Sequence, residues 1–137
     1  MSLLLGSINP KVRVLIAAIL TIASLLILLW PSDVSRHVSF FSSFFSFELR
    51  PFDFIEAIGH IFLFAFVTLV WQWALVKYVA LERAIFVTIV IVSTLALGTE
   101  IGQYFVNRSS LLFDLLANIL GISFAIVAYR IYYQTNS

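Results

Sequence analysis

Residues 84–105 have the sequence AIFVTIVIVSTLALGTEIGQYF, and residues 111–132 continue the chain with LLFDLLANILGISFAIVAYRIY. A helix needs about 20 apolar residues to cross about 30 Å of hydrocarbon, and each stretch is that long. The two therefore predict a membrane-spanning helical hairpin. The hairpin nevertheless carries two acids, Glu100 and Asp114, which an apolar environment disfavours.

Two earlier stretches, residues 12–30 and 54–75, are equally apolar and equally long. The whole chain is 62% hydrophobic and 11% charged, whereas a soluble domain is about 45–50% apolar and about 25% charged. Backbone groups in lipid must bond within their own segment, and the alternation of barrel strands is absent. We predict an all-α membrane protein in which residues 1–137 form a single domain, a small bundle of four transmembrane helices.

Basic residues in the helix flanks predict the orientation of the chain. Five of them flank the side that holds both termini: Lys11, Arg13, Lys77, Arg83 and Arg130. Three lie on the opposite side: Arg36, Arg50 and Arg108. Cytoplasmic flanks carry the excess of lysine and arginine in membrane proteins. Both termini are therefore expected in the cytoplasm.

The outer loop, residues 31–53, contains serines at positions 39, 42, 43 and 46 among phenylalanines. This spacing follows one face of a helix and favours an interfacial helix over residues 38–48, with its phenylalanines in the headgroup layer. A hydrophobic loop packed over the mouth of the bundle is the alternative.

Six polar residues lie in the outer turns of three predicted helices, in pairs that share a helix face. The pairs are Glu56 with His60, Glu100 with Gln103, and Asp114 with Asn118. A charged group in a span costs about 2.5–3.5 kcal/mol, so buried acids usually face protein or water. Arg108, in the outer hairpin, is expected between the two carboxylates. The spacing thus predicts one polar site at the outer ends of the helices.

The residue types in this site suit proton transfer, because a histidine beside carboxylates titrates near neutral pH. We predict Glu100, Asp114 and His60 as catalytic residues. The predicted ligand-binding residues are Arg108, Gln103, Asn118 and Glu56. Alternatively, the polar set only holds the helices together.

Other classes of ligand find little support in the composition. With two histidines and no cysteine, we expect no metal site, and we expect no cofactor. A net charge of +1 gives no reason to expect a nucleic-acid partner.

The outer polar residues follow the pattern Glu100-x2-Gln103-x4-Arg108-x5-Asp114-x3-Asn118-x2-Gly121. This pattern resembles the signature of the VanZ-like family, small bacterial membrane proteins named for a member linked to low-level resistance to the glycopeptide teicoplanin. His60 followed by Phe64 resembles the first motif of the same family. Together the matches cover residues 53–125.

One position departs from the family pattern. The family usually has an Asp-Lys pair shortly before the histidine, and here Glu56 and Ala57 occupy those positions. Glu56 is an acid like the family's aspartate, whereas Ala57 replaces the lysine. If that lysine helps to bind an anion, this protein binds one more weakly or differently.

The resemblance implies a multi-pass protein of the bacterial inner membrane with a role in the cell envelope. Its implied partners are membrane lipid, a lipid-linked or cell-wall precursor, and other membrane proteins. We therefore predict an outward-facing polar site that binds or processes a polar envelope molecule, in relation to glycopeptide resistance. The alternative is a non-enzymatic accessory subunit, and the resemblance leaves open whether any reaction is catalysed.

Overall fold

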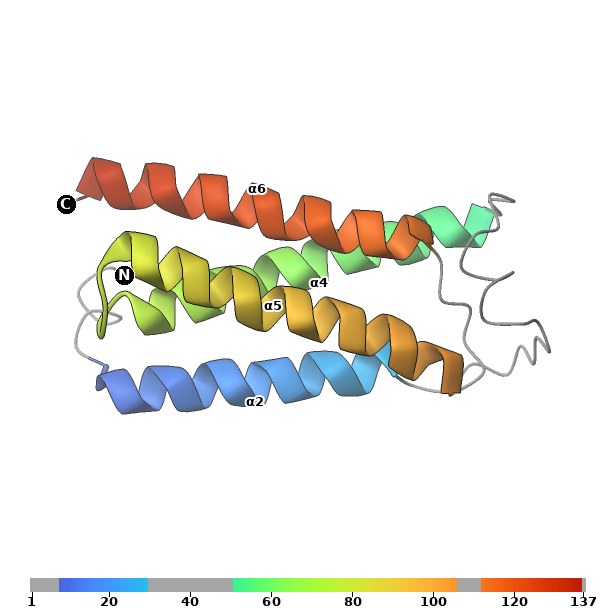
Figure 1. The fold of residues 1–137 in the computed structure, drawn as a ribbon, viewed down its shortest axis with the longest axis horizontal. Helices are drawn as coiled ribbons and strands as arrows, with labels where there is room; N and C mark the ends of the chain where they lie inside the picture. Colours follow the sequence, from blue (N-terminus) through green and yellow to red (C-terminus); the bar gives the residue numbers. More distant parts are fainter. Residues whose placement is uncertain (1–7, 30–50, 106–111, 137) are drawn as a thin grey trace.

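The computed structural model describes residues 8–29, 51–105 and 112–136, and within them the chain forms four long helices (Figure 1). These are α2 (Pro10–Leu28), α4 (Pro51–Leu75), α5 (Leu81–Phe105) and α6 (Leu112–Asn136). At a rise of 1.5 Å per residue, α2 is about 28 Å long and each of the others about 37 Å. Each helix is long and apolar enough to cross a membrane, so the all-α, four-span prediction is confirmed.

The observed helices begin or end a few residues away from the predicted bounds. Pro10 and Pro51 are the first residues of α2 and α4, where the missing N–H of proline costs nothing. The side chain of Asn9 accepts a hydrogen bond from the Lys11 backbone N–H at 2.9 Å and caps α2. At its end α6 runs four residues beyond the predicted position 132. Hydrophobicity alone underestimates the length of this helix, because its last turn, residues 133–136, is polar.

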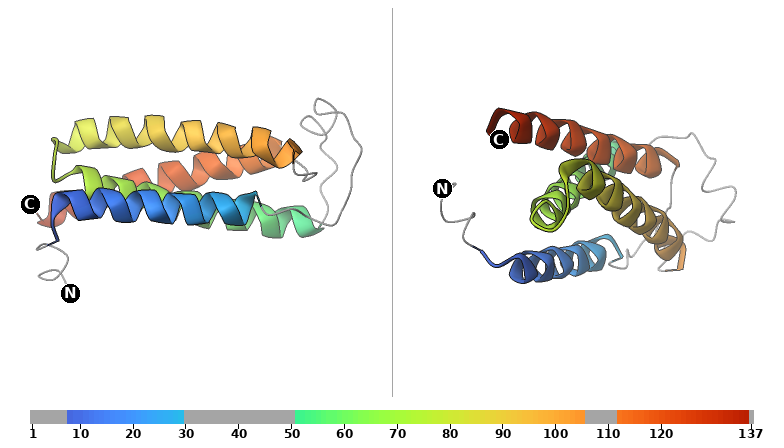
Figure 2. Two further views of the ribbon diagram at one scale, coloured as in Figure 1. Left: turned by 90° about the horizontal axis from the view of Figure 1, so that it is seen from below. Right: turned by 60° about the vertical axis from the view of Figure 1, so that its left-hand side comes forward.

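The bundle has two ends. We call the end where α4 and α6 begin and α2 and α5 finish the cluster end, and the opposite one the termini end (Figures 1 and 2). The predicted interfacial helix over residues 38–48 and the predicted contact of Arg108 lie outside the described residues.

The interior is almost as polar as it is apolar, as expected for a bundle that faces lipid. The described residues include 12 buried polar or charged side chains and 13 buried hydrophobic ones. On the outside, Phe62 and Phe124 are each 71% exposed. Between the two ends lies a core of six buried residues: Leu28, Phe64, Val67, Val92, Ala96 and Ile122.

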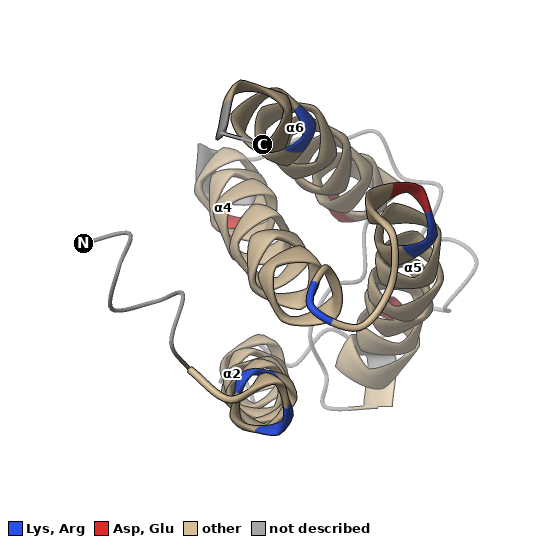
Figure 3. Cartoon of the chain, turned by 90° about the vertical axis from the view of Figure 1, so that its left-hand side faces the viewer, with Lys and Arg blue, Asp and Glu red and all other residues tan. Residues whose placement is uncertain are grey.

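Helix α4 is the centre of the bundle, because it packs against each of the other three helices (Figure 3). Its contact with α6 is the most extensive, and these two helices run parallel. Ala117, Gly121 and Ala125 of α6 are four residues apart and all buried, so they form the small-residue stripe that lets helices approach closely in membranes. A β-carbon at Gly121 would overlap the backbone carbonyl of Ile61.

Replacing Gly121 with alanine therefore tests this approach. We expect Gly121→Ala to lower the free energy of unfolding by about 1–3 kcal/mol, since an added methyl group must push apart two backbones. Thermal unfolding in detergent measures the loss. The matched control is Gly98→Ala, because a β-carbon there meets nothing within 4 Å. Alanine is a better helix former by about 1 kcal/mol, so the control should be neutral or stabilising. Equal effects of the two changes would contradict the close packing of α4 on α6.

Candidate functional site

Three helices bring polar side chains together at the cluster end. His60 comes from α4, Glu100 and Gln103 from α5, and Asp114 and Asn118 from α6. Each of the five is at most 2% exposed. We refer to these five residues as the polar cluster. Of these residues, His60, Asn118 and Glu100 are in contact with one another, whereas Gln103 contacts the backbone of α2.

Asn118 joins the other two helices of the polar cluster. Its Oδ1 lies 2.8 Å from Nδ1 of His60, and its Nδ2 donates to Oε1 of Glu100 at 3.0 Å. Nδ1 of His60 is also 4.0 Å from the same carboxylate oxygen. The side chain of Asn118 therefore connects α4 and α5 through α6.

The orientation of the Asn118 carboxamide selects one tautomer of His60. Nδ2 of Asn118 donates to Glu100, so its Oδ1 faces His60 and accepts a hydrogen bond there. In the tautomer that carries its hydrogen on Nδ1, His60 donates to Asn118.

Gln103 extends the polar cluster to the fourth helix. Its Nε2 donates to the backbone carbonyl of Leu28 at 3.3 Å, in the last turn of α2, where carbonyls lack an intrahelical partner. Among the described residues, Oε1 of Gln103 accepts no hydrogen bond, although it is buried. The polar cluster thus contains a buried acceptor that a ligand hydroxyl or N–H could use.

The two remaining acids lie at the same end. Asp114 is 1% exposed in the first turn of α6, where the helix dipole favours a negative charge. Glu56 lies one turn before His60 on α4 and is half-buried. The placement of Arg108 between the carboxylates stays a prediction, since that residue is outside the described ranges.

Sequence reasoning missed two features next to the polar cluster. The ring of Phe64 stacks on His60, with centroids 6.2 Å apart and planes 13° apart, so one side of the imidazole is apolar. The α2 backbone also takes part, through Leu28. Nothing in the sequence signals a backbone carbonyl as a partner, whereas the i, i+4 spacing of His60 and Phe64 could have indicated the ring contact.

The termini end holds a second set of buried polar groups that the sequence analysis did not identify. Arg13 was predicted from the sequence to be a flanking charge, but its side chain is only 2% exposed. Its guanidinium lies 4.6 Å from the centroid of the Trp73 ring and donates to the carbonyls of Trp73 and Ile8, each at 3.3 Å. Gln72 and Thr88 are fully buried, and their side-chain polar atoms find no hydrogen-bond partner in the part of the chain that the structure covers.

In residues 8–29, 51–105 and 112–136, no three histidine, cysteine, aspartate or glutamate side chains are arranged to hold a metal ion. The ionisable side chains of the polar cluster are His60, Glu100 and Asp114.

These features define a class: a multi-pass integral membrane protein, with four spanning helices in the described part of the chain and a buried polar cluster at one end. The family model for VanZ/LLP1 matches residues 15–133, and the chain belongs to that family. This confirms the resemblance seen in the sequence motifs. No curated protein and no solved structure matches the chain.

The bridging role of Asn118 makes a stability prediction. Asn118→Leu removes one partner each from His60 and Glu100 and leaves both groups buried, so the free energy of unfolding should fall by about 1–3 kcal/mol or more. In a double-mutant cycle with Glu100→Gln, the coupling energy should be about 0.5–3 kcal/mol, because the two side chains are in contact. Thermal unfolding in detergent measures both quantities.

Gln134→Leu is the matched control for the loss of a carboxamide. Gln134 is exposed on the same helix, and exposed substitutions usually change stability by less than about 0.5 kcal/mol. Additive effects of Asn118→Leu and Glu100→Gln would contradict the bridge.

Proposed function

We propose that this VanZ/LLP1 family member binds the polar group of a lipid-linked envelope molecule, a cell-wall precursor or related lipid, at the polar cluster. The observation that carries the proposal is the chain of contacts from His60 through Asn118 to Glu100 across three helices. A cluster of this kind is costly in a membrane, and intramembrane ionisable residues are functional-site candidates for that reason.

The charge of the polar cluster favours one type of polar group. Glu100 and Asp114 are acids, Glu56 is a third acid nearby, and Oε1 of Gln103 is an acceptor without a hydrogen bond among the described residues. Carboxylate and amide oxygens bind hydroxyl and N–H donors, whereas they repel a bare phosphate. We therefore expect the sugar or peptide portion of a precursor to occupy the polar cluster.

Proton transfer is the reaction that the polar cluster could catalyse. Nδ1 of His60 lies 2.8 Å from Oδ1 of Asn118 and 4.0 Å from the Glu100 carboxylate, so the ring is held between these two groups. Nε2 could then pass a proton to or from a hydroxyl of the bound molecule. In this proposal Glu100 and Asp114 complete the acid–base group, Asn118 and Gln103 orient it, and Glu56 and Arg108 contact the ligand.

A second candidate function rests on the burial of the same residues. Every member of the polar cluster is at most 2% exposed, and its hydrogen bonds connect α2, α4, α5 and α6. A non-enzymatic accessory subunit, held together by this network, would show the same burial. The two functions differ in whether conservative substitutions abolish activity while the protein still folds.

We also propose that the protein lies in the bacterial inner membrane with its cluster end facing outward. The positively charged residues support this orientation, because lysines and arginines gather at the termini end (Figure 3). One of them, Arg130, pairs at 2.9 Å with Glu82, and both side chains are exposed. A polar envelope molecule would then reach the polar cluster from the side on which the cell wall is built.

Single substitutions in the polar cluster separate the two functions. Glu100→Gln, Asp114→Asn and His60→Ala should each abolish complementation of a deletion strain, measured as teicoplanin tolerance, with the protein accumulating normally. General acid–base groups contribute about 10²–10⁴-fold to a rate, so each loss should be nearly complete. Glu82→Gln is the control, since that acid is exposed at the termini end. Full complementation by all three variants would contradict the proposed binding site. If protein abundance falls together with complementation, the accessory-subunit function is favoured.

The proposed orientation can be tested with introduced cysteines, because the chain has none of its own. Lys77 and Phe105 are both exposed, at the termini end and at the cluster end respectively. In intact spheroplasts, a membrane-impermeant maleimide should label Phe105→Cys, and it should label Lys77→Cys only after permeabilisation. The reverse pattern would place the polar cluster on the cytoplasmic side.

A further inference from the structure

Two buried polar side chains near the termini end take no part in the polar cluster. Gln72 of α4 and Thr88 of α5 are each 0% exposed. Among the described residues, no hydrogen bond reaches Nε2 or Oε1 of Gln72 or Oγ1 of Thr88. Buried polar atoms in folded proteins nearly always have a hydrogen-bond partner, and the hydrocarbon around the bundle offers none. These atoms therefore indicate a ligand inside the bundle.

The hydroxyl of Thr88 differs from those of other buried threonines. Thr68 and Thr99 donate to carbonyls of their own helices at 2.6 and 2.8 Å respectively, and Thr21 does the same at 2.7 Å. A threonine within a helix satisfies its hydroxyl in this way when the side chain turns back to the preceding turn. Within α5, Thr88 forms no such bond. Its hydroxyl is therefore available to a partner outside its own helix.

The antiparallel packing of α4 and α5 directs these two side chains toward one level of the bundle. Gln72 lies three residues before the end of α4 at Leu75, and Thr88 lies seven residues after the start of α5 at Leu81. A helical side chain leans toward the N-terminus of its own helix. Gln72 therefore extends from the termini end into the bundle, and Thr88 extends back toward that end. The difference of four residues between their positions is about 6 Å along the axis.

Water is the ligand whose chemistry fits this pair. Gln72 offers an N–H group and a carbonyl oxygen, and Thr88 offers a hydroxyl that both donates and accepts. A buried water needs two to four polar partners, and these groups supply them. The α5 residue level with Gln72 is Ala84, three residues after Leu81, and its short side chain occupies little space beside the carboxamide. A single water molecule can thus join the two helices.

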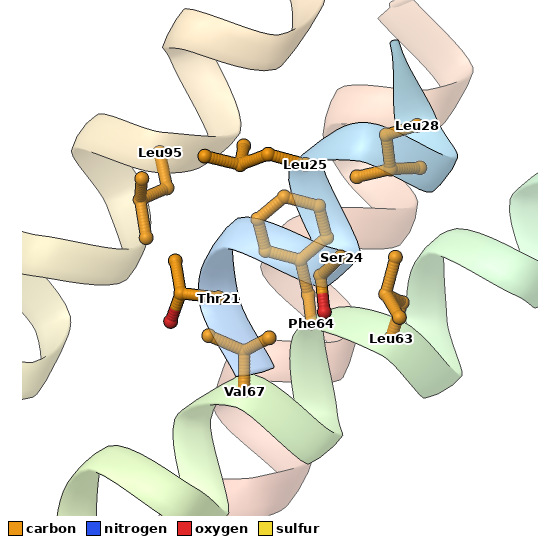
Figure 4. A pocket seen from close by; sticks show the side chains of 8 residues that line it. All are labelled: Thr21, Ser24, Leu25, Leu28, Leu63, Phe64, Val67 and Leu95. Atoms are coloured by element: carbon orange, nitrogen blue, oxygen red, sulfur yellow. The ribbon is translucent and has the colours of Figure 1, made fainter. Parts of the chain in front are cut away.

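This pair is separated from the polar cluster by the apolar core. Gln72 follows His60 by 12 residues on α4, which is about 18 Å along the helix axis. Between them Phe64 and Val67 are buried, and they line a small apolar hollow together with Leu25 of α2 (Figure 4). The end of α4, in contrast, is within one turn of Gln72. Water therefore reaches the pair from the termini end.

From these observations we propose that Gln72 and Thr88 bind an internal water molecule between α4 and α5, on the termini side of the apolar core. The water takes the place of the direct hydrogen bond that the two side chains do not form. It links two helices at this end as Asn118 links His60 and Glu100 at the other. The inference is independent of the proposed function, because no residue of the polar cluster takes part in it.

The test uses the full chain in phospholipid vesicles, with ¹⁵N-labelled glutamine and solid-state NMR. The chain has three glutamines, at positions 72, 103 and 134, and the variant Gln72→Leu assigns the first signal by its disappearance. Magnetisation is transferred from water to the side-chain amides at mixing times too short for amide hydrogen exchange. The exposed Gln134 is the positive control. We expect Gln72 to receive magnetisation from water although it is fully buried.

Thr88→Val removes one partner of the water and keeps the shape of the side chain. It should reduce the transfer to Gln72 several-fold. Thr94→Val is the matched control, because Thr94 lies on the same helix, is exposed and donates to its own Val90 carbonyl at 2.8 Å. It should leave the transfer to Gln72 unchanged.

The unaltered chain decides the first point even if Thr88→Val does not fold. A Gln72 signal that receives nothing from water, at mixing times that fill the Gln134 signal, overturns the inference. Transfer that Thr88→Val leaves unchanged overturns the shared site, and so does an equal loss in Thr94→Val. A loss in Thr88→Val alone supports it. The proposed function is tested separately by the variants of the polar cluster.

Discussion

The carboxylate of Glu100 needs hydrogen bonds inside the bundle, because the surrounding hydrocarbon offers none. Asn118 supplies one of them at 3.0 Å and holds His60 with its other end at 2.8 Å. Removing one partner from such a group leaves a buried polar atom unsatisfied, which costs more than the hydrogen bond contributes. The mutual position of α4, α5 and α6 at the cluster end is therefore tied to the side chain of Asn118.

The packing of α6 on α4 allows this bridge to form. A carboxamide is short, so the backbones must approach closely before it can reach side chains on two neighbouring helices. Gly121 provides that approach one turn beyond Asn118, where it lies directly on the Ile61 carbonyl. Polar bonding and small-residue packing thus act on the same helix pair, as expected where the hydrophobic effect does not drive helices together.

The two regions around Phe64 give the bundle an amphiphilic interior. The Phe64 ring stacks on His60 of the polar cluster, and it also lines a small apolar hollow with Leu25 and Val67. At the opposite end, Arg13 is buried against Trp73 and fixes the start of α2 on α4. Helix α2 is therefore held at both ends, at its start by Arg13 and at its end by Gln103.

The sequence by itself determined the four helices and the depth of the polar residues. Apolar runs of the required length predict spans, and i, i+3 or i+4 spacing places Glu100 with Gln103 and Asp114 with Asn118 on common faces. The motif of these residues also indicated the family. Periodicity determines which face of a helix is polar, but it does not determine which helix that face meets.

Only the tertiary structure decided the partners. It selected Asn118 as the bridge between His60 and Glu100, joined Gln103 to the α2 backbone and buried Arg13. It also made α4 the central helix and left a small apolar hollow lined by α2, α4 and α5. The physical reason is that these contacts depend on the offset and separation of helices distant in sequence, which are set by packing across the bundle and leave no periodic signal within any one helix.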